Sequence, residues 1–199
     1  MKLIVISSPV YLPNEAGCIN LLFENGMEYL HLRKPDGTAS DLDRLLRGIC
    51  PAFLSKIAVH QHFPVALEYG IRRLHFPENL RMTTDESTLM QMKSEGFILS
   101  TSIHKLLDTN ILTSFDYTFF GPVYNSISKP GYQGILPPGF RLDAAEKKLP
   151  VIGLGGIDQS NIRNIKEMNF DGAAVSGTLW KNPAKAPQTF IQLNNVLNQ

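Results

Sequence analysis

Two hydroxyl side chains and one ammonium group stand close together in the stretch DYTFFGPVYNSISKPGYQG, residues Asp116–Gly134. The stretch begins as an apolar, aromatic segment typical of a strand and then turns at a Gly-Pro pair. Ser126, Ser128 and Lys129 follow in the loop. Lysine binds phosphates as a point charge, and hydroxyls add directed hydrogen bonds. The spacing therefore predicts a loop that binds a phosphate or a diphosphate.

Glycines mark the ends of two later apolar segments, in PVIGLGGID and in FDGAAVSGTLW. Gly155 and Gly156 follow the first segment, and Ser176 and Gly177 follow the second. Glycine lets backbone N–H groups approach an anion closely. In eight-stranded barrels a phosphate is often bound between the loops after strands seven and eight. We predict that these four residues bind a phosphate, although glycines that only form a tight strand-to-helix turn would give the same pattern.

A run of polar residues, His31-Leu32-Arg33-Lys34, ends another apolar segment. Side chains alternate along a strand, so His31 and Arg33 are expected on the same face. We predict that Arg33 binds a second anionic group of the substrate and that His31 and Lys34 contribute to substrate binding. An arginine neutralised by a carboxylate of the core is the alternative.

A serine and a histidine, Ser102 and His104, follow the fifth apolar segment. Histidine is the side chain whose unperturbed pKa lies near neutrality, so His104 is a candidate proton donor or acceptor. Ser102 is a candidate substrate contact. The alternative for His104 is a structural role as the cap of the next helix.

Three more histidines, His60, His62 and His75, resemble a zinc-binding set in composition when Glu78 is added. Their spacing matches no known ligand pattern, and a metal site needs ligands that converge in space. We therefore expect these imidazoles, His60 in particular, to stack on or hydrogen-bond a heterocyclic substrate.

Eight short apolar segments, mostly without alternation, are typical of strands buried on both faces. They are Leu3–Ser7, Tyr29–Leu32, Ile57–His60, Arg73–Phe76, Phe97–Thr101, Tyr117–Gly121, Val151–Leu154 and Gly172–Ser176. Helices are expected between them at Asn14–Asn25, from a Ser40 cap to about Leu54, within Phe63–Ile71, at Thr84–Glu95, near Leu142–Lys148, at Asp158–Met168 and at Pro183–Leu197.

The alternation of strands and helices predicts one α/β domain over residues 1–199, a (β/α)₈ TIM barrel. An open doubly wound sheet is the alternative, but no GxGxxG follows the first strand. Barrel chemistry lies at the carboxyl ends of the strands. The polar residues described above would therefore share one mouth of the barrel.

The composition narrows the classes of partner. The chain has 199 residues, 43% of them hydrophobic, and a net charge of +1. This balance gives no basic footprint for nucleic acid or for an anionic membrane surface. Cys18 and Cys50 show no metal-binding spacing, and the apolar run at the start is too short for a signal sequence or a membrane span. We expect a cytoplasmic location and small-molecule partners, with a homo-oligomer left open.

The chain resembles the thiamine phosphate synthase and TenI superfamily, small single-domain barrels of the thiamine pathway, from about Leu3 to Trp180. FFGPVYNSISKPG is similar to the synthase stretch G-P-[VI]-[FY]-x-[TS]-x-[TS]-K, in which two hydroxyl residues and a lysine bind a diphosphate. SIH matches the family's S-x-H, and the glycine segments match its thiazole-phosphate cradle. The resemblance implies a transferase that joins hydroxymethylpyrimidine diphosphate to thiazole phosphate and releases diphosphate. Its catalytic residues would be His104, Lys129 and Arg33.

The chain departs from the synthase pattern at three strand ends. Synthases usually carry Q-x-R-x-K on strand two, where this chain has HLRKP. They carry Asn-Asp after strand three, where this chain has His60-Gln61, and after strand four only Glu78 could replace a second magnesium-binding aspartate. Mg²⁺ prefers carboxylate oxygens, so we expect it to bind weakly if at all.

Because of these departures the resemblance also leaves two alternatives open. One is a TenI-like thiazole tautomerase, in which His104 would carry a proton without a metal. The other is a non-catalytic binder of phosphates of the thiamine pathway.

Overall fold

The strands close into a barrel, as the sequence predicted. The computed structural model describes residues 1–125 and 134–199. Its eight strands are all parallel and follow one another around the barrel in sequence order, with β8 pairing with β1. They are β1 (Lys2–Ile6), β2 (Tyr29–Leu32), β3 (Ile57–Val59), β4 (Arg73–Phe76), β5 (Ile98–Ile103), β6 (Tyr117–Phe120), β7 (Val151–Leu154) and β8 (Gly172–Val175). The fold is a single (β/α)₈ barrel.

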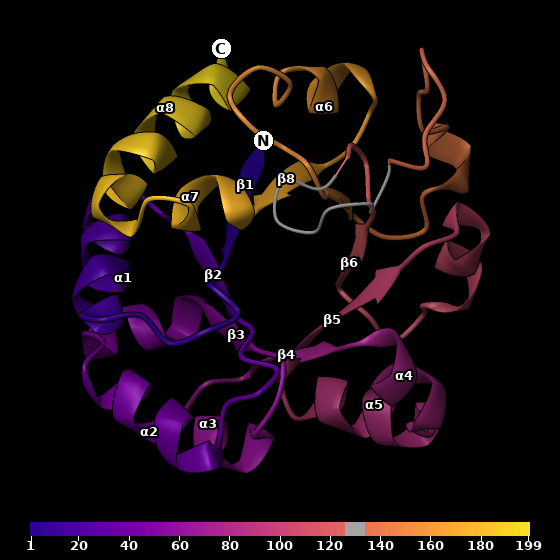
Figure 1. The fold of residues 1–199 in the computed structure, drawn as a ribbon. Coiled ribbons are helices and arrows are strands. Elements are labelled where there is room, and N and C mark those ends of the chain that lie inside the picture. Colours follow the sequence, from indigo (N-terminus) through magenta and orange to yellow (C-terminus); the bar gives the residue numbers. More distant parts are fainter. Residues whose placement is uncertain (126–133) are drawn as a thin grey trace.

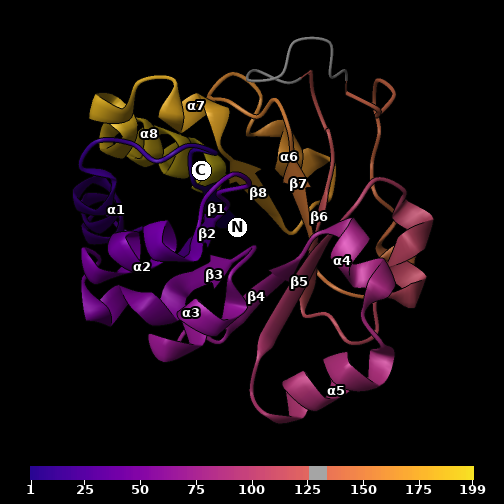
Figure 2. The ribbon, with the colours of Figure 1, turned by 60° about the horizontal axis from the view of Figure 1, so that its bottom comes forward.

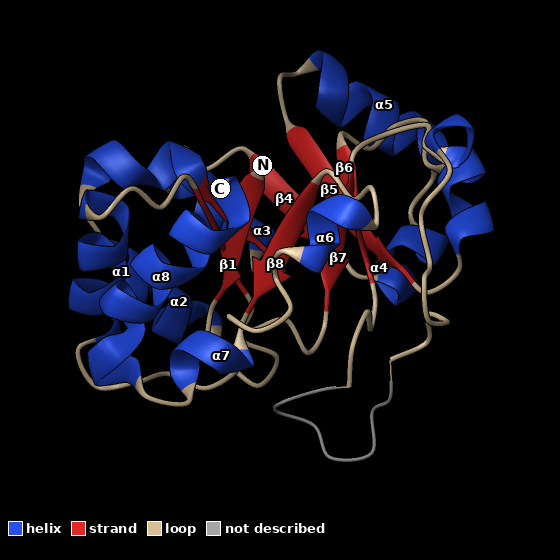
Figure 3. Ribbon diagram, turned by 90° about the horizontal axis from the view of Figure 1, so that it is seen from above, coloured by secondary structure: helices blue, strands red, loops and turns tan. Residues whose placement is uncertain are grey.

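Helices surround the strands (Figures 1 and 3). The α-helices are α1 (Glu15–Glu24), α2 (Ala39–Arg47), α3 (Phe63–Glu68), α4 (Glu78–Thr83), α5 (Glu86–Ser94), α6 (Asn164–Glu167), α7 (Gly177–Trp180) and α8 (Ala186–Asn198). Short 3-10 helices cover Pro51–Lys56, Leu106–Ile111, Ala144–Glu146 and Pro183–Lys185. The tilted view in Figure 2 shows α1, α2 and α3 on one side of the barrel and α4 and α5 on the other. None of the described helices is long and apolar enough to cross a membrane.

Local hydrogen bonds explain where predicted helices were wrong. The second helix is capped by Thr38 instead of Ser40, because Thr38 and Asp41 form a reciprocal capping box. It ends at Arg47, and a 3-10 helix replaces its predicted continuation. In the predicted helix Asp158–Met168, the Asp158 carboxylate accepts hydrogen bonds from the N–H and hydroxyl of Ser160. Such side-chain bonds compete with helix formation, and only α6 is helical there.

The structure also differs from the helix predictions in two other places. The helix predicted over Thr84–Glu95 is confirmed as α5, but α4 before it was not predicted. Near Leu142–Lys148 only a 3-10 turn forms, and the carboxylate of Asp143 accepts a hydrogen bond from the N–H of Ala145 there.

The interior of the barrel is unusually polar. Its apolar cluster is small and consists of Ile4, Ile6, Phe119, Ile152 and Ala174. Barrel interiors of this fold are normally filled by layers of branched apolar side chains. Here three buried imidazoles, from strands β2 and β4 and from the end of β3, take part of that space. The larger apolar cluster includes side chains of the strands and of the surrounding helices, such as Val5, Leu22 and Leu193.

Candidate active site

A cavity of about 330 Å³ lies at the carboxyl ends of the strands. We call it the mouth cavity. Its polar lining residues are Arg33, Ser102, His104, Gly155, Gly156, Ser176, Gly177 and Thr178. Ile6, Phe119, Leu154 and Ala174 give it an apolar surface. The cavity therefore combines several polar groups with an apolar wall, which is the usual composition of a site for a small ligand.

The glycine side of the mouth cavity depends on backbone geometry that only glycine supplies easily. Gly155 and Gly156 have φ values of +105° and +63°. A Cβ atom at Gly156 would overlap the carbonyl oxygen of Asn125, and one at Gly155 would lie 2.8 Å from Pro122. The carbonyl of Gly155 also accepts a hydrogen bond of 3.0 Å from the N–H of Tyr124. These glycines therefore fix the loop after β7 against the chain that follows β6.

The same loops carry backbone donors suited to an anion. Within the described residues, no hydrogen bond is donated by the backbone N–H groups of Gly155, Gly156 or Gly177. All three residues line the mouth cavity. Thr178 beside them donates its hydroxyl proton to the carbonyl of Ile157, which ties the loop after β7 to α7. The requirement for glycine at this turn agrees with the alternative that these residues only form a tight turn. The open N–H groups are in addition suited to bind a phosphate.

We expect Gly156→Ala to destabilise the fold more than the same change at Gly70. Both glycines have a similar positive φ, +63° and +71°, but a Cβ atom at Gly70 would meet open space. Gly70→Ala should therefore show the cost of a left-handed alanine alone, about 1–2 kcal/mol. Gly156→Ala adds the overlap with Asn125, so its loss of unfolding free energy in urea should be clearly larger. Equal losses in the two variants would contradict the close packing of these loops.

The opposite side of the mouth cavity carries Arg33, Ser102 and His104. No ion pair among the described residues involves the guanidinium of Arg33, so the core-carboxylate alternative finds no partner there. Nδ1 of His104 lies 2.6 Å from the carbonyl oxygen of Gly121 and donates to it, because a carbonyl only accepts. Nε2 is then the free nitrogen, 3.9 Å from the carboxylate of Glu78. Arg33 and His104 are thus placed to meet a ligand.

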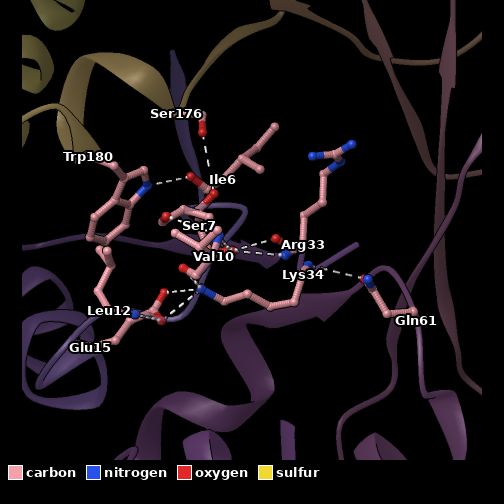
Figure 4. A network of polar contacts seen from close by, with 11 residues as sticks. Ile6, Ser7, Val10, Leu12, Glu15, Arg33, Lys34, Gln61, Ser176 and Trp180 are labelled. Atoms are coloured by element: carbon pink, nitrogen blue, oxygen red, sulfur yellow. Dashed lines mark hydrogen bonds and ion pairs between the residues drawn. The ribbon is translucent and has the colours of Figure 1, made fainter. Parts of the chain in front are cut away.

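Lys34 lies away from the mouth cavity, contrary to the expectation that it assists substrate binding. Its ammonium is 2.6 Å from one carboxylate oxygen of Glu15 and 2.8 Å from the carbonyl oxygen of Val10. Figure 4 shows that the Lys34 side chain runs toward Glu15, whereas the guanidinium of Arg33 points in another direction. The charged atoms of both Lys34 and Glu15 are buried. Lys34 therefore holds the loop before α1 against the end of β2.

Two of the predicted substrate contacts, His31 and His60, lie inside the barrel and do not line the mouth cavity. Nδ1 of His31 is 3.0 Å from Nε2 of His60, and its Nε2 is 2.8 Å from the hydroxyl of Tyr117. His60 stacks on His75 with 4.0 Å between ring centroids. Stacking on a heterocyclic substrate is therefore replaced, for His60, by stacking within the protein.

Burial sets the protonation of these three rings. It lowers the pKa of His75 to about 3, with a further contribution from the charge of Arg33. Burial also lowers the pKa of His31 and His60 well below the usual range, and the neighbouring His75 adds to both shifts. All three imidazoles are therefore neutral near pH 7.

Some of the predicted site residues lie outside the described residues. Ser126, Ser128 and Lys129, the proposed diphosphate-binding set, fall in residues 126–133, so their roles stay predictions. The sequence reasoning also missed two residues. Thr178 lines the mouth cavity, and its position directly after Ser176-Gly177 was a usable signal. Tyr117 faces His31, and the strand pattern alone gave no sign of that contact.

The described residues do not provide the carboxylate set that Mg²⁺ prefers. Glu78 stands beside His104 at the carboxyl end of the barrel. Gln61, at the position where synthases usually carry an aspartate, accepts a 3.4 Å hydrogen bond from the N–H of Lys34. Among the described residues the only group of three or more possible ligands consists of imidazoles, whereas Mg²⁺ favours oxygen.

These features define a (β/α)₈ barrel with a cavity at the carboxyl ends of its strands, lined by glycine backbone, Arg33 and His104. A family model described as thiamine monophosphate synthase matches residues 3–179. The chain therefore belongs to the thiamine monophosphate synthase family, which supports the role of a transferase in thiamine biosynthesis.

Individual relatives agree with this assignment. A thiamine-phosphate synthase of Bacteroides fragilis (strain YCH46) is 23% identical over 188 residues, covering 87% of this chain and 89% of that protein. One from Bordetella bronchiseptica is 27% identical over 170 residues, covering 79% and 77%. The crystal structure of a thiamine phosphate pyrophosphorylase from Bacteroides thetaiotaomicron is 28% identical and gives a TM-score of 0.76, covering 100% of this chain and 98% of that one.

Proposed function

We propose that this protein joins a hydroxymethylpyrimidine diphosphate to a thiazole phosphate, releasing diphosphate and forming thiamine phosphate. The observation that carries the proposal is the mouth cavity, which has open backbone N–H groups on one side and an unpaired guanidinium among the described residues on the other. Two separate anion-binding positions suit a reaction between two phosphorylated substrates. The relatives named above, whose names describe this activity, support the same choice.

In this proposal, different residues of the chain bind different parts of the two substrates. Gly155, Gly156 and Gly177 hold the phosphate of the thiazole through backbone N–H groups. The apolar wall, with Phe119 and Leu154, packs against the rings. Arg33 binds the diphosphate, together with the predicted loop residues Ser126, Ser128 and Lys129. Positioning and charge stabilisation are the expected sources of catalysis.

The proposed reaction needs no reactant besides the two substrates. The C–O bond between the pyrimidine methylene and the diphosphate breaks, and the diphosphate leaves with the electron pair. The thiazole nitrogen then supplies its lone pair to the methylene carbon, which forms the new C–N bond. Arg33 stabilises the negative charge that grows on the leaving group.

An assay tests this proposal directly. The purified protein is mixed with both substrates, and thiamine phosphate is measured by fluorescence after oxidation, with added Mg²⁺ and with a chelator. We expect product to form. A folded protein that gives no product at any Mg²⁺ concentration would rule the synthase reaction out.

A thiazole tautomerase is the second candidate, and the geometry of His104 favours it. With Nδ1–H held by Gly121, the free Nε2 is available to accept a proton near the Glu78 carboxylate. Such an arrangement can move a proton on a thiazole carboxylate phosphate without a metal.

The tautomerase candidate predicts metal-independent conversion of that substrate, lowered about 10²–10⁴-fold in His104→Ala. The exposed variant Lys105→Ala serves as the control and should keep full activity. Conversion that survives His104→Ala would reject the role of His104. If the protein binds thiamine phosphate but catalyses neither reaction, it is a binder of pathway phosphates and both enzymatic proposals fail.

A further inference from the structure

Three buried histidines, His31, His60 and His75, converge inside the barrel. We call them the histidine cluster. One ring nitrogen from each lies within 4.8 Å of the other two. In residues 1–125 and 134–199, no other group of three or more His, Cys, Asp or Glu side chains comes together in this way. The function proposed above uses none of these three rings.

We propose that the histidine cluster binds one divalent transition-metal ion of the Zn²⁺ type. Imidazole nitrogen is a preferred ligand of such ions, and three histidines with one open position make a common zinc site. This set differs from the sequence-based one, because His62 lies apart with its Nε2 on the carbonyl oxygen of Gly37, 2.7 Å away. His31 takes its place, and only the closed barrel brings it there.

The distances are close to those that a metal requires. Zn–N bonds of about 2.0–2.1 Å in a tetrahedral site place ligand nitrogens roughly 3.3 Å apart. Nδ1 of His31 and Nε2 of His60 are already 3.0 Å apart. The spread of up to 4.8 Å within the cluster requires movements of about an ångström or more. The stacked rings of His60 and His75 would also have to turn, so that one nitrogen of each faces the ion. A bound ion would replace the His31–His60 hydrogen bond.

For His31 and His75, the partners of the outer nitrogens match those of metal-binding histidines. Such a histidine usually donates its second N–H to an oxygen, which fixes its tautomer. Nε2 of His31 is 2.8 Å from the hydroxyl of Tyr117. The two nitrogens of His75 are 3.0 and 3.1 Å from the hydroxyls of Ser100 and Ser102, so either one has an oxygen partner when the other binds the ion.

The chemical state of the rings also suits a metal. A metal ligand must be deprotonated, and burial lowers the pKa of all three imidazoles. An ion bound in the histidine cluster would also affect the mouth cavity. Ser102, one hydrogen bond from His75, lines the mouth cavity, so the ion would place positive charge just below the predicted anion-binding site.

The test is a titration of tag-free, chelator-treated protein with Co²⁺, which reports its coordination by visible absorption. We expect saturation at one Co²⁺ per chain, with the intense ligand-field bands of a four- or five-coordinate ion. Equimolar Zn²⁺ should displace the Co²⁺ and raise the temperature of unfolding. A spectrum that stays that of six-coordinate aqueous Co²⁺ overturns the proposal.

Variants locate the ion. His60→Gln should weaken Co²⁺ affinity at least about tenfold, and Tyr117→Phe, which removes the oxygen partner of His31, about 10–100-fold. Tyr117→Phe serves where His60→Gln does not fold. The control is His62→Asn, because Asn tolerates the positive φ of 57° at this position. Unchanged affinity in His60→Gln and Tyr117→Phe, or an equal loss in His62→Asn, places the metal elsewhere and overturns the proposal.

Discussion

Glu15→Ala is expected to lower the free energy of unfolding by about 3–5 kcal/mol, measured by urea denaturation. The residue Lys34 is only 2% exposed, and its ammonium lies 2.6 Å from the Glu15 carboxylate. The variant leaves that ammonium buried without its counter-ion, and the carbonyl of Val10 alone cannot compensate for the lost charge. The Glu15 carboxylate also accepts a hydrogen bond from the N–H of Leu12, which the variant removes.

A double variant shows whether the cost comes from the unpaired charge. Glu15→Met combined with Lys34→Met removes both charges and keeps similar volumes, so it should recover most of the lost stability. An exposed pair offers a second comparison. Arg44 is 77% exposed beside Asp41, and Arg44→Ala should leave the unfolding midpoint almost unchanged. If Glu15→Ala were as mild as Arg44→Ala, the buried pair would not stabilise the fold as described.

Arg33→Ala is expected to lower kcat/KM of the proposed synthase reaction about 10²–10³-fold. The guanidinium lines the mouth cavity and forms no ion pair with any described residue, so its charge is available to the substrate. For the same reason the variant should unfold at the same urea concentration as the parent protein. Steady-state kinetics together with a denaturation curve separate the two effects.

A conservative substitution at Arg33 tests whether the shape of its guanidinium matters as well as its charge. Arg33→Lys keeps the charge but loses the planar fork that binds phosphate oxygens in pairs, so it should recover only part of the activity. The control is Arg47→Ala, because Arg47 is 72% exposed on the outer helix α2. Full activity in Arg33→Ala would show that the diphosphate is bound by other groups.

The barrel was predictable because its evidence is local. Each strand is a short apolar run, and three of them, Tyr29–Leu32, Arg73–Phe76 and Val151–Leu154, have the predicted bounds. The helices were harder to predict, because single side-chain hydrogen bonds set their ends. Thr38 caps α2 two residues before the predicted Ser40, and the Asp158 carboxylate bonds to Ser160 where a helix was predicted.

The candidate site was likewise predictable only where its evidence is local. The glycine pair Gly155-Gly156 and the S-x-H residues are short motifs whose position at strand ends places them in the mouth cavity. Lys34 differs from Arg33 only by one step along the chain, and that step turns its side chain toward Glu15. The convergence of His31 with His60 and His75 depends on the closure of the whole barrel, so no local pattern shows it.

A crystal structure of the protein with thiamine phosphate tests the central claim most directly. The account predicts the phosphate in the mouth cavity, within hydrogen-bonding distance of the N–H groups of Gly155, Gly156 and Gly177, with the rings against Phe119 and Leu154. A phosphate bound elsewhere on the molecule, with the mouth cavity empty, would contradict it.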